Sequence, residues 1–117
     1  MAKIHIGPFT ASKYRNTKVE VNGYLFDSKK EASRYRELLI MEKAGLIRNL
    51  RLQVKYQLTP TMHFGKETLR SSYYVADFVY DEDGQEVVED VKGMRTPLYI
   101  LKKKVLAYRY GVLVREV

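Results

Sequence analysis

The chain has 117 residues, 45% of them hydrophobic and 12% aromatic, which is enough to bury the core of one folded domain. Lysine and arginine number 21 against 14 acidic residues, and the resulting formal net charge of +7 favours a polyanionic partner. The absence of cysteine excludes disulfides and thiolate metal sites. The two histidines, His5 and His63, are isolated and do not suggest a histidine-rich zinc site.

The sequence also bears on where the protein acts. No run approaches the roughly 20 apolar residues of a membrane span, and the first residues, MAKIHIGPF, lack the apolar segment of a secretory signal. We therefore expect one cytoplasmic domain over residues 1–117, with a basic, irregular arm over residues 1–17 and no membrane partner.

The first predicted elements are two short strands and a helix. The strands span 17–21 and 24–26, and the Asn-Gly pair at 22–23 favours a two-residue hairpin turn between them. Residues 28–31 read SKKE, the spacing of a helix-capping box, so we expect a helix to about Ala44, ended by the glycine that follows. The inward stripe of this helix is predicted to contain Ala32, Tyr35, Leu38 and Leu39.

Period-two alternation marks the next element. Apolar and polar residues alternate over 50–58, which predicts a strand with one apolar and one polar face. Gln53 and Lys55 on the polar face are candidates for contacts to phosphate or for hydrogen bonds that support a catalytic group, with a solvated strand face as the alternative. The segment 59–70 contains a proline and a glycine and is predicted to be a loop.

The stretch YYVADFVYDEDGQEVVEDVKG, residues 73–93, predicts a second hairpin. Its Asp-Gly pair at 83–84 favours a type I′ turn, in which both central residues have positive φ. That turn fixes a register in which Asp77 lies opposite Asp90. Because side chains alternate along a strand, we expect Asp77, Asp90 and Lys92 on one face of the sheet.

Two facing carboxylates need a compensating partner. Like charges directly across a ladder destabilise it by roughly up to 1 kcal/mol, and by more where the face is partly buried. A divalent cation would offset this cost, and hard oxygen ligands suit Mg²⁺ or Mn²⁺. The alternative for Asp90 and Lys92 is a local surface pair, but Asp77 has apolar neighbours on both sides and needs a partner. The other acids of the hairpin are interpreted as solvated or structural groups; they are Glu82, Asp83, Glu86 and Glu89. Glu89 is expected on the opposite face from Asp90.

A second helix is predicted after Thr96-Pro97, with the threonine as N-cap and the proline at the first helical position. It is expected to reach Tyr110, with Gly111 ending it. Three lysines, 102–104, are expected on its outer side. A final strand is expected at 112–114. The buried stripe of the helix is predicted to be Leu98, Leu101, Val105 and Tyr108.

The order of these motifs resembles the PD-(D/E)XK nuclease superfamily. Ala76-Asp77 stands where that family often has Pro-Asp, and residues 90–92, Asp-Val-Lys, stand at its acidic-x-Lys element. The segments FDSKKEASRY, VADFVY and VVEDVKG look most like small phage-encoded nucleases related to Holliday-junction resolvases and to TnsA-like transposase endonucleases. The resemblance runs from about Phe26 to Val117. It implies an α/β (α+β) fold with an αβββαβ restriction-endonuclease-like core, a central mixed sheet flanked by helices.

The resemblance implies an Mg²⁺-dependent endodeoxyribonuclease that hydrolyses phosphodiester bonds in branched or duplex DNA. Mn²⁺ is the expected substitute metal, and the implied ligands are Asp77, Asp90, the Val91 carbonyl and Glu31, with Lys92 acting on water and phosphate. For Glu31 the alternative is that it only caps its helix. No small-molecule cofactor is implied. Symmetric cutting of branched DNA would require a homodimer, and a phage enzyme would act in the host cytoplasm.

Basic and amide side chains along the chain are the candidate DNA contacts. They are Lys13, Arg15, Lys29, Lys30, Arg34, Gln53, Lys55, Lys102 and Lys103. Two other interpretations stay open. One is a non-catalytic DNA-binding module that keeps the nuclease fold, and the other is an RNA-associated or ribosome-associated binder, which only the charge supports.

Overall fold

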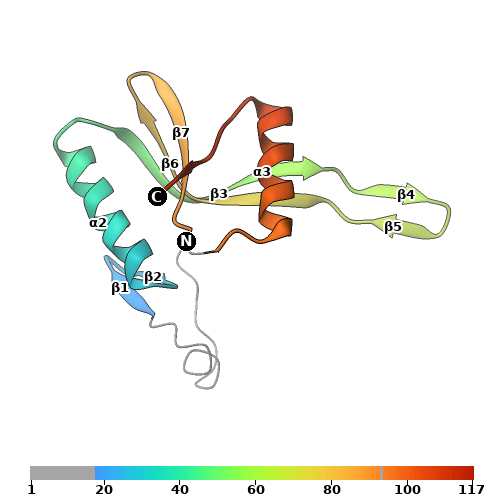
Figure 1. The fold of residues 1–117 in the computed structure, drawn as a ribbon, viewed down its shortest axis with the longest axis horizontal. Helices are drawn as coiled ribbons and strands as arrows, with labels where there is room; N and C mark the ends of the chain where they lie inside the picture. Colours follow the sequence, from blue (N-terminus) through green and yellow to red (C-terminus); the bar gives the residue numbers. More distant parts are fainter. Residues whose placement is uncertain (1–17, 93) are drawn as a thin grey trace.

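The computed structural model describes residues 18–92 and 94–117 and shows a mixed α/β fold with two helices and a mixed multistranded sheet (Figure 1). The expected arm over 1–17, with Lys13 and Arg15, lies outside these residues. None of the helices described is both long and apolar enough to cross a membrane. The elements follow in the order β1 (Val19–Val21), β2 (Tyr24–Phe26), α2 (Lys29–Lys43), β3 (Arg48–Thr59), β4 (Met62–Phe64), β5 (Glu67–Leu69), β6 (Ser72–Glu82), β7 (Gln85–Asp90), α3 (Pro97–Tyr110) and β8 (Arg115–Glu116).

The main sheet has four strands in the order β3-β6-β7-β8. The first three run antiparallel, and β8 returns after α3 to pair in parallel with β7. The hairpins β1-β2 and β4-β5 form two further small sheets. Helix, three sheet strands, helix and strand therefore follow one another as expected, with the β4-β5 hairpin inserted between β3 and β6.

The turn and cap predictions are confirmed. The two predicted hairpin turns have positive φ at both central residues, 52° and 82° at residues 22–23 and 52° and 78° at residues 83–84. Ser28 and Thr96 cap α2 and α3, because each hydroxyl accepts a hydrogen bond from the backbone N–H three residues later, at 3.1 Å in both cases. Gly111 ends α3 in the left-handed conformation, with φ 67°.

Two apolar clusters attach the helices to the sheet. One joins α2 and the first hairpin to β6 and consists of Phe26, Ala32, Tyr35, Leu38, Ile47, Phe78 and Tyr80. The other joins α3 to the sheet and consists of Leu58, Tyr74, Ala76, Val79, Val88, Leu106 and Val114. Asp77 therefore lies on β6 between a residue that packs towards α3, Ala76, and one that packs towards α2, Phe78.

This change of side departs from the strict alternation expected for these strands. The β3-β6 ladder pairs Leu52 with Phe78 and Val54 with Ala76, but it does not pair Gln53 with Asp77. Gln53 has a φ of 52° in the middle of β3, a left-handed conformation that extended strands do not use. The irregularity is thus opposite Asp77, at the point where β6 passes from one cluster to the other.

The predicted buried stripe of α3 is correct for Val105, which packs against the cluster that joins α3 to the sheet, and wrong for its other three members. Leu98, Leu101 and Tyr108 are 61%, 57% and 93% exposed, whereas Leu106 is fully buried. The orientation of the helix is set by Glu116 of β8. The Tyr99 hydroxyl donates a hydrogen bond to Glu116 at 2.6 Å, and the Lys103 ammonium forms an ion pair with it at 3.1 Å. These contacts turn most of the predicted stripe to solvent.

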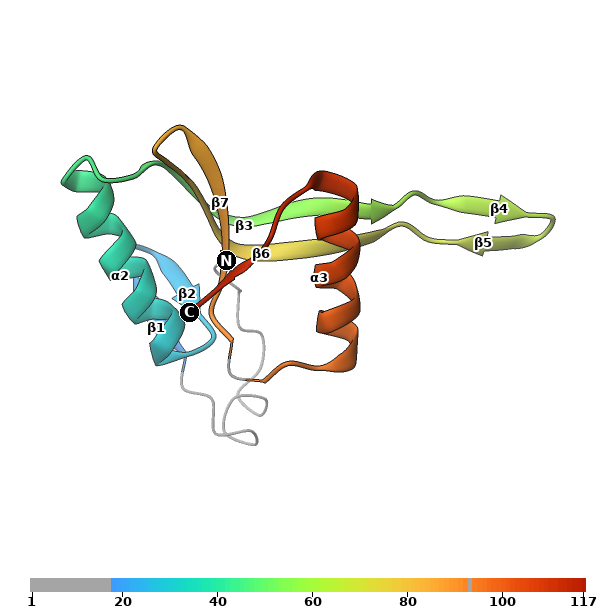
Figure 2. The same cartoon turned by 45° about the horizontal axis from the view of Figure 1, so that its top comes forward.

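Two boundaries also need correction. The segment 59–70 is not a loop, because β4 and β5 form a hairpin around Gly65 that projects from the end of β3 and β6 (Figure 2). Pro60 is tolerated because it lies between β3 and β4, outside either strand. The last strand is Arg115–Glu116 rather than 112–114, because Val114 packs in the α3 cluster and the pairing with β7 begins one residue later.

Candidate active site

The hairpin register brings Asp77 and Asp90 together as predicted. The β6-β7 ladder runs from Glu82 and Gln85 to Phe78 and Glu89, so its next position places Asp77 opposite Asp90. The Asp77 N–H donates to Asp90 Oδ1 at 2.8 Å, and the Val91 N–H donates to Asp77 Oδ2 at 3.0 Å. Each carboxylate is thus oriented by a backbone N–H of the neighbouring strand.

Lys92 joins this pair from just beyond β7. Its Nζ lies 3.7 Å from Asp90 Oδ2 and 4.3 Å from the centre of the Tyr99 ring. Strand β8 fixes the backbone on the other side, since the Val117 N–H donates to the Asp90 carbonyl at 3.0 Å and the Lys92 N–H donates to the Val117 carbonyl at 3.3 Å. The expected cluster of two acids and one amine is therefore present and held from both flanking strands.

Two further side chains contact the carboxylates. The Gln53 amide donates to Asp77 Oδ1 at 3.3 Å, and the Tyr74 hydroxyl donates to Asp90 Oδ2. The sequence had indicated Gln53 as a group that either supports the carboxylates or contacts phosphate, and the structure shows a contact to Asp77; Tyr74 was not predicted. Tyr74 stands in an apolar strand, where a tyrosine is indistinguishable by pattern from an ordinary core residue.

Burial makes the charged forms of both acids costly. Asp90 is 1% exposed and Asp77 is partly buried. Loss of solvent raises the pKa of both carboxyls above the ordinary value, and the backbone N–H donors and Lys92 offset only part of this rise. A cation bound between the carboxylates would relieve the same cost.

These raised pKa values predict a pH-dependent difference between wild type and Asp77→Asn. An aspartate titrates near pH 3.9 in an unfolded chain. Above that value the native state holds protons that the unfolded state has lost, so the contribution of Asp77 to stability falls as pH rises through its folded pKa. Without metal, Asp77→Asn should therefore gain stability relative to wild type as pH rises from about 4 towards neutrality, until the folded-state carboxyl is ionised. Urea unfolding in a chelator measures this, and a difference that is constant with pH would contradict it.

The donor set fits a hard divalent cation coordinated by two carboxylates. Magnesium in proteins is commonly held by one or two carboxylates, with water and substrate phosphate completing its shell. Within residues 18–92 and 94–117, no group of three or more His, Cys, Asp or Glu side chains is arranged to hold a metal. We therefore base the ligand set on Asp77 and Asp90. A ligand role for Glu31 or the Val91 carbonyl stays a prediction, while Glu31 does occupy the capping position.

The strained backbone of Gln53 gives a second prediction. A left-handed non-glycine residue inside a strand costs about 1–2 kcal/mol, and here it accompanies the amide contact to Asp77. Gln53→Gly should keep or raise the free energy of unfolding and weaken Mn²⁺ binding. Asn49→Gly is the matched control, since Asn49 is also left-handed in β3, with φ 57°, and lies at the end of the strand that pairs with Asp81. Equal Mn²⁺ affinity in both variants, measured by calorimetry, would contradict the role of Gln53.

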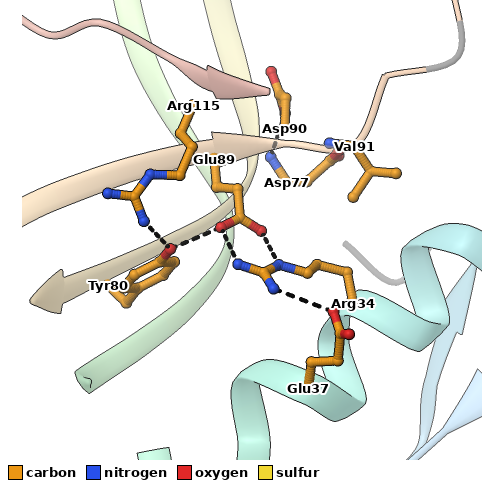
Figure 3. A network of polar contacts seen from close by, with 8 residues as sticks. All are labelled: Arg34, Glu37, Asp77, Tyr80, Glu89, Asp90, Val91 and Arg115. Atoms are coloured by element: carbon orange, nitrogen blue, oxygen red, sulfur yellow. Dashed lines mark hydrogen bonds and ion pairs between the residues drawn. The ribbon is translucent and has the colours of Figure 1, made fainter. Parts of the chain in front are cut away.

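The opposite side of β7 holds a separate network. Glu89 is fully buried and accepts hydrogen bonds from Arg34 Nε at 2.6 Å, Arg34 Nη2 at 2.9 Å and the Tyr80 hydroxyl at 2.7 Å. Figure 3 shows Glu89 pointing towards Arg34 of α2 while Asp90 points away from it. The hydrogen bond to Glu89 also raises the pKa of Arg34. Arg34 therefore bridges α2 to the sheet, and a DNA contact by Arg34 stays a prediction.

The other predicted DNA contacts differ in their surroundings. Lys29 and Lys55 are exposed, and Lys30 Nζ donates to the Lys92 carbonyl at 3.3 Å. Lys103 is held by Glu116, whose pKa falls to about 2 because Tyr99, Lys103 and Arg95 donate to it. Lys102 lines a hollow of about 270 Å³ together with Asp90, Lys92 and Tyr73. Lys30 and Lys102 thus lie close to Lys92, and DNA contacts by Lys29, Lys30, Lys55, Lys102 and Lys103 stay predictions.

Comparison with known proteins places the chain in a family. A family model described as "Protein of unknown function (DUF1064)" matches residues 11–116. The chain belongs to the DUF1064 family. No curated protein and no solved structure matches the chain. The family description assigns no chemistry, so the function of this DUF1064 member has to be argued from the geometry of the carboxylates.

Proposed function

We propose that this protein is a metal-dependent DNA endonuclease with a PD-(D/E)XK-like core. The observation that supports it most is the cross-strand pair of a buried and a partly buried carboxylate, each oriented by a backbone N–H from across the ladder, with Lys92 beside Asp90. The order α2, β3, β6, β7, α3, β8 agrees with the αβββαβ arrangement that the motifs imply. A net charge of +7 suits a DNA substrate.

The roles of the residues follow from their positions. Asp77 and Asp90 would hold Mg²⁺ or Mn²⁺, which lowers the pKa of a bound water and neutralises charge on the phosphate. Lys92 lies beside Asp90, where its ammonium group would stabilise negative charge that develops on the phosphoryl oxygens. Gln53 and Tyr74 orient the two carboxylates through their hydrogen bonds. Cleavage at this site would leave 5′-phosphate ends, as the resemblance implies.

A homodimer is part of this proposal. The exposed leucines of α3, Leu98 and Leu101, form an apolar helix face beside the site, and a second copy would cover it. Two-fold pairing would present two sites to two strands of a branched substrate. Sedimentation of wild type and Leu101→Lys tests this point, with loss of the dimer as the expected result and an unchanged monomer in both as the contrary one.

A non-catalytic DNA-binding module is the second candidate. It is favoured by the fact that, in the part of the chain described, two carboxylates rather than three are brought together. The two candidates differ in one experiment. Purified protein is incubated with supercoiled plasmid and with four-way DNA in Mg²⁺, Mn²⁺ or chelator. Nicked or linear products that require metal support the nuclease, and binding without cleavage in either metal supports the module.

A further inference from the structure

The β4-β5 hairpin is the most isolated part of the described structure. It continues the ribbon of β3 and β6 away from the rest of the molecule, as both ribbon views show (Figures 1 and 2). Among the helices and strands described, β4 and β5 pack only against each other. We call Met62–Leu69 the β-ribbon. A two-stranded hairpin without a core is marginally stable in water, so an external partner would stabilise it.

The surface of the β-ribbon suggests which partner. Phe64 and Leu69 are 65% and 41% exposed, and both lie with Met62 on one face by the pairing of the strands. Lys66 in the turn and Arg70 just beyond β5 are exposed and outnumber the single acid, Glu67. The β-ribbon itself carries one cation, Lys66, and one acid, Glu67, which pairs with Phe64, and Arg70 just outside it gives this end of the hairpin a net positive charge. Two exposed cations beside an exposed aromatic have the chemistry of a DNA groove binder.

A protein partner fits this surface less well. A stable interface buries about 800 Å² on each side, which is more than the three apolar side chains of the β-ribbon supply alone. Cations next to an apolar wedge suit DNA instead, because cations contact phosphates while Phe, Leu and Met side chains insert at base steps. The major groove is also wide enough to admit a two-stranded ribbon.

We propose that the β-ribbon binds a groove of duplex DNA about one helical turn from the carboxylates. Gly65 at the tip and Asp77 are 12 positions apart in nearly continuous strand. At about 3.3 Å per residue they are separated by roughly 40 Å, close to the 34–36 Å of one DNA turn. This inference rests on the proposed function, because the comparison with one DNA turn assumes that DNA lies at Asp77 and Asp90.

The test uses the whole chain with DNA in chelator, so that no cleavage occurs. Fluorescence anisotropy compares duplexes of about one and three turns for wild type and for Lys66→Ala with Arg70→Ala. The double variant should bind the long duplex about tenfold more weakly, with a salt slope lower by about two, and should bind the short duplex as wild type does. Phe64→Ser should weaken binding to the long duplex without changing the slope.

The matched control is Arg36→Ala with Lys43→Ala, which removes two exposed cations from α2. An equal loss of affinity in both double variants would overturn the proposal, because it would reflect net charge alone. The proposal would also be overturned if Phe64→Ser were monomeric where wild type is dimeric in sedimentation and bound DNA with unchanged affinity. A second copy of the chain would then be the partner of the β-ribbon. Absence of cleavage by wild type would reject the nuclease function and leave this binding test valid.

Discussion

Asp77→Asn is expected to lower the rate of DNA cleavage by at least about 10³-fold and to leave DNA affinity in chelator within about twofold of wild type. The amide keeps an oxygen that can accept the Val91 N–H, so the hairpin should keep its shape. It removes the negative charge that a cation needs. Gel assays on plasmid and four-way DNA measure the rate, and anisotropy measures the affinity.

Asp90→Asn should give the same loss, because its carboxylate is oriented by the Asp77 N–H and contacts Lys92. Asp81→Asn is the matched control on β6, since Asp81 lies towards the hairpin turn and forms an ion pair with Arg51 at 3.8 Å. It should cleave as wild type does. Cleavage that survives Asp77→Asn, Asp90→Asn and Lys92→Ala would reject the site.

Arg34→Met is expected to have the largest effect on stability, lowering the free energy of unfolding by about 3–5 kcal/mol. The substitution leaves the Glu89 carboxylate fully buried without the guanidinium that now donates two hydrogen bonds to it. Small domains have about 5–15 kcal/mol of stability in total, so this loss would unfold a large fraction of the molecules under mild denaturation. Urea unfolding followed by circular dichroism measures the change.

Two variants make this result interpretable. Arg36→Met removes an exposed arginine from the same helix and should change stability by less than about 1 kcal/mol. Adding Glu89→Leu to Arg34→Met removes the unpaired buried charge and should restore most of the loss. If Arg34→Met and Arg36→Met unfold at the same urea concentration, the pair of Arg34 and Glu89 is not structural.

The features that the sequence predicts well depend on local chemistry. An Asn-Gly or Asp-Gly pair adopts positive φ at both positions wherever it joins two strands, and Ser28 and Thr96 cap helices through hydrogen bonds within three residues. The pairing of Asp77 with Asp90 follows from the same logic. A two-residue turn fixes the register of the whole hairpin, and so it places two acids opposite one another.

The features that the sequence does not predict depend on contacts between distant residues. The rotation of α3 is set by Glu116, which follows the helix and reaches back to Tyr99 and Lys103. The assignment of Arg34 to Glu89 links residues 55 positions apart. The left-handed Gln53 has no local signal, because glutamine is not a residue that favours positive φ. Such contacts are settled by tertiary packing.

The central claim is that Asp77 and Asp90 together hold a divalent cation, and calorimetric titration of Mn²⁺ into the metal-free protein tests it most directly. We predict saturable uptake by wild type and by Asp81→Asn, and loss of uptake in Asp77→Asn and in Asp90→Asn, with circular dichroism showing that all four proteins are folded. Equal uptake by all four proteins, or none by wild type, would contradict the claim.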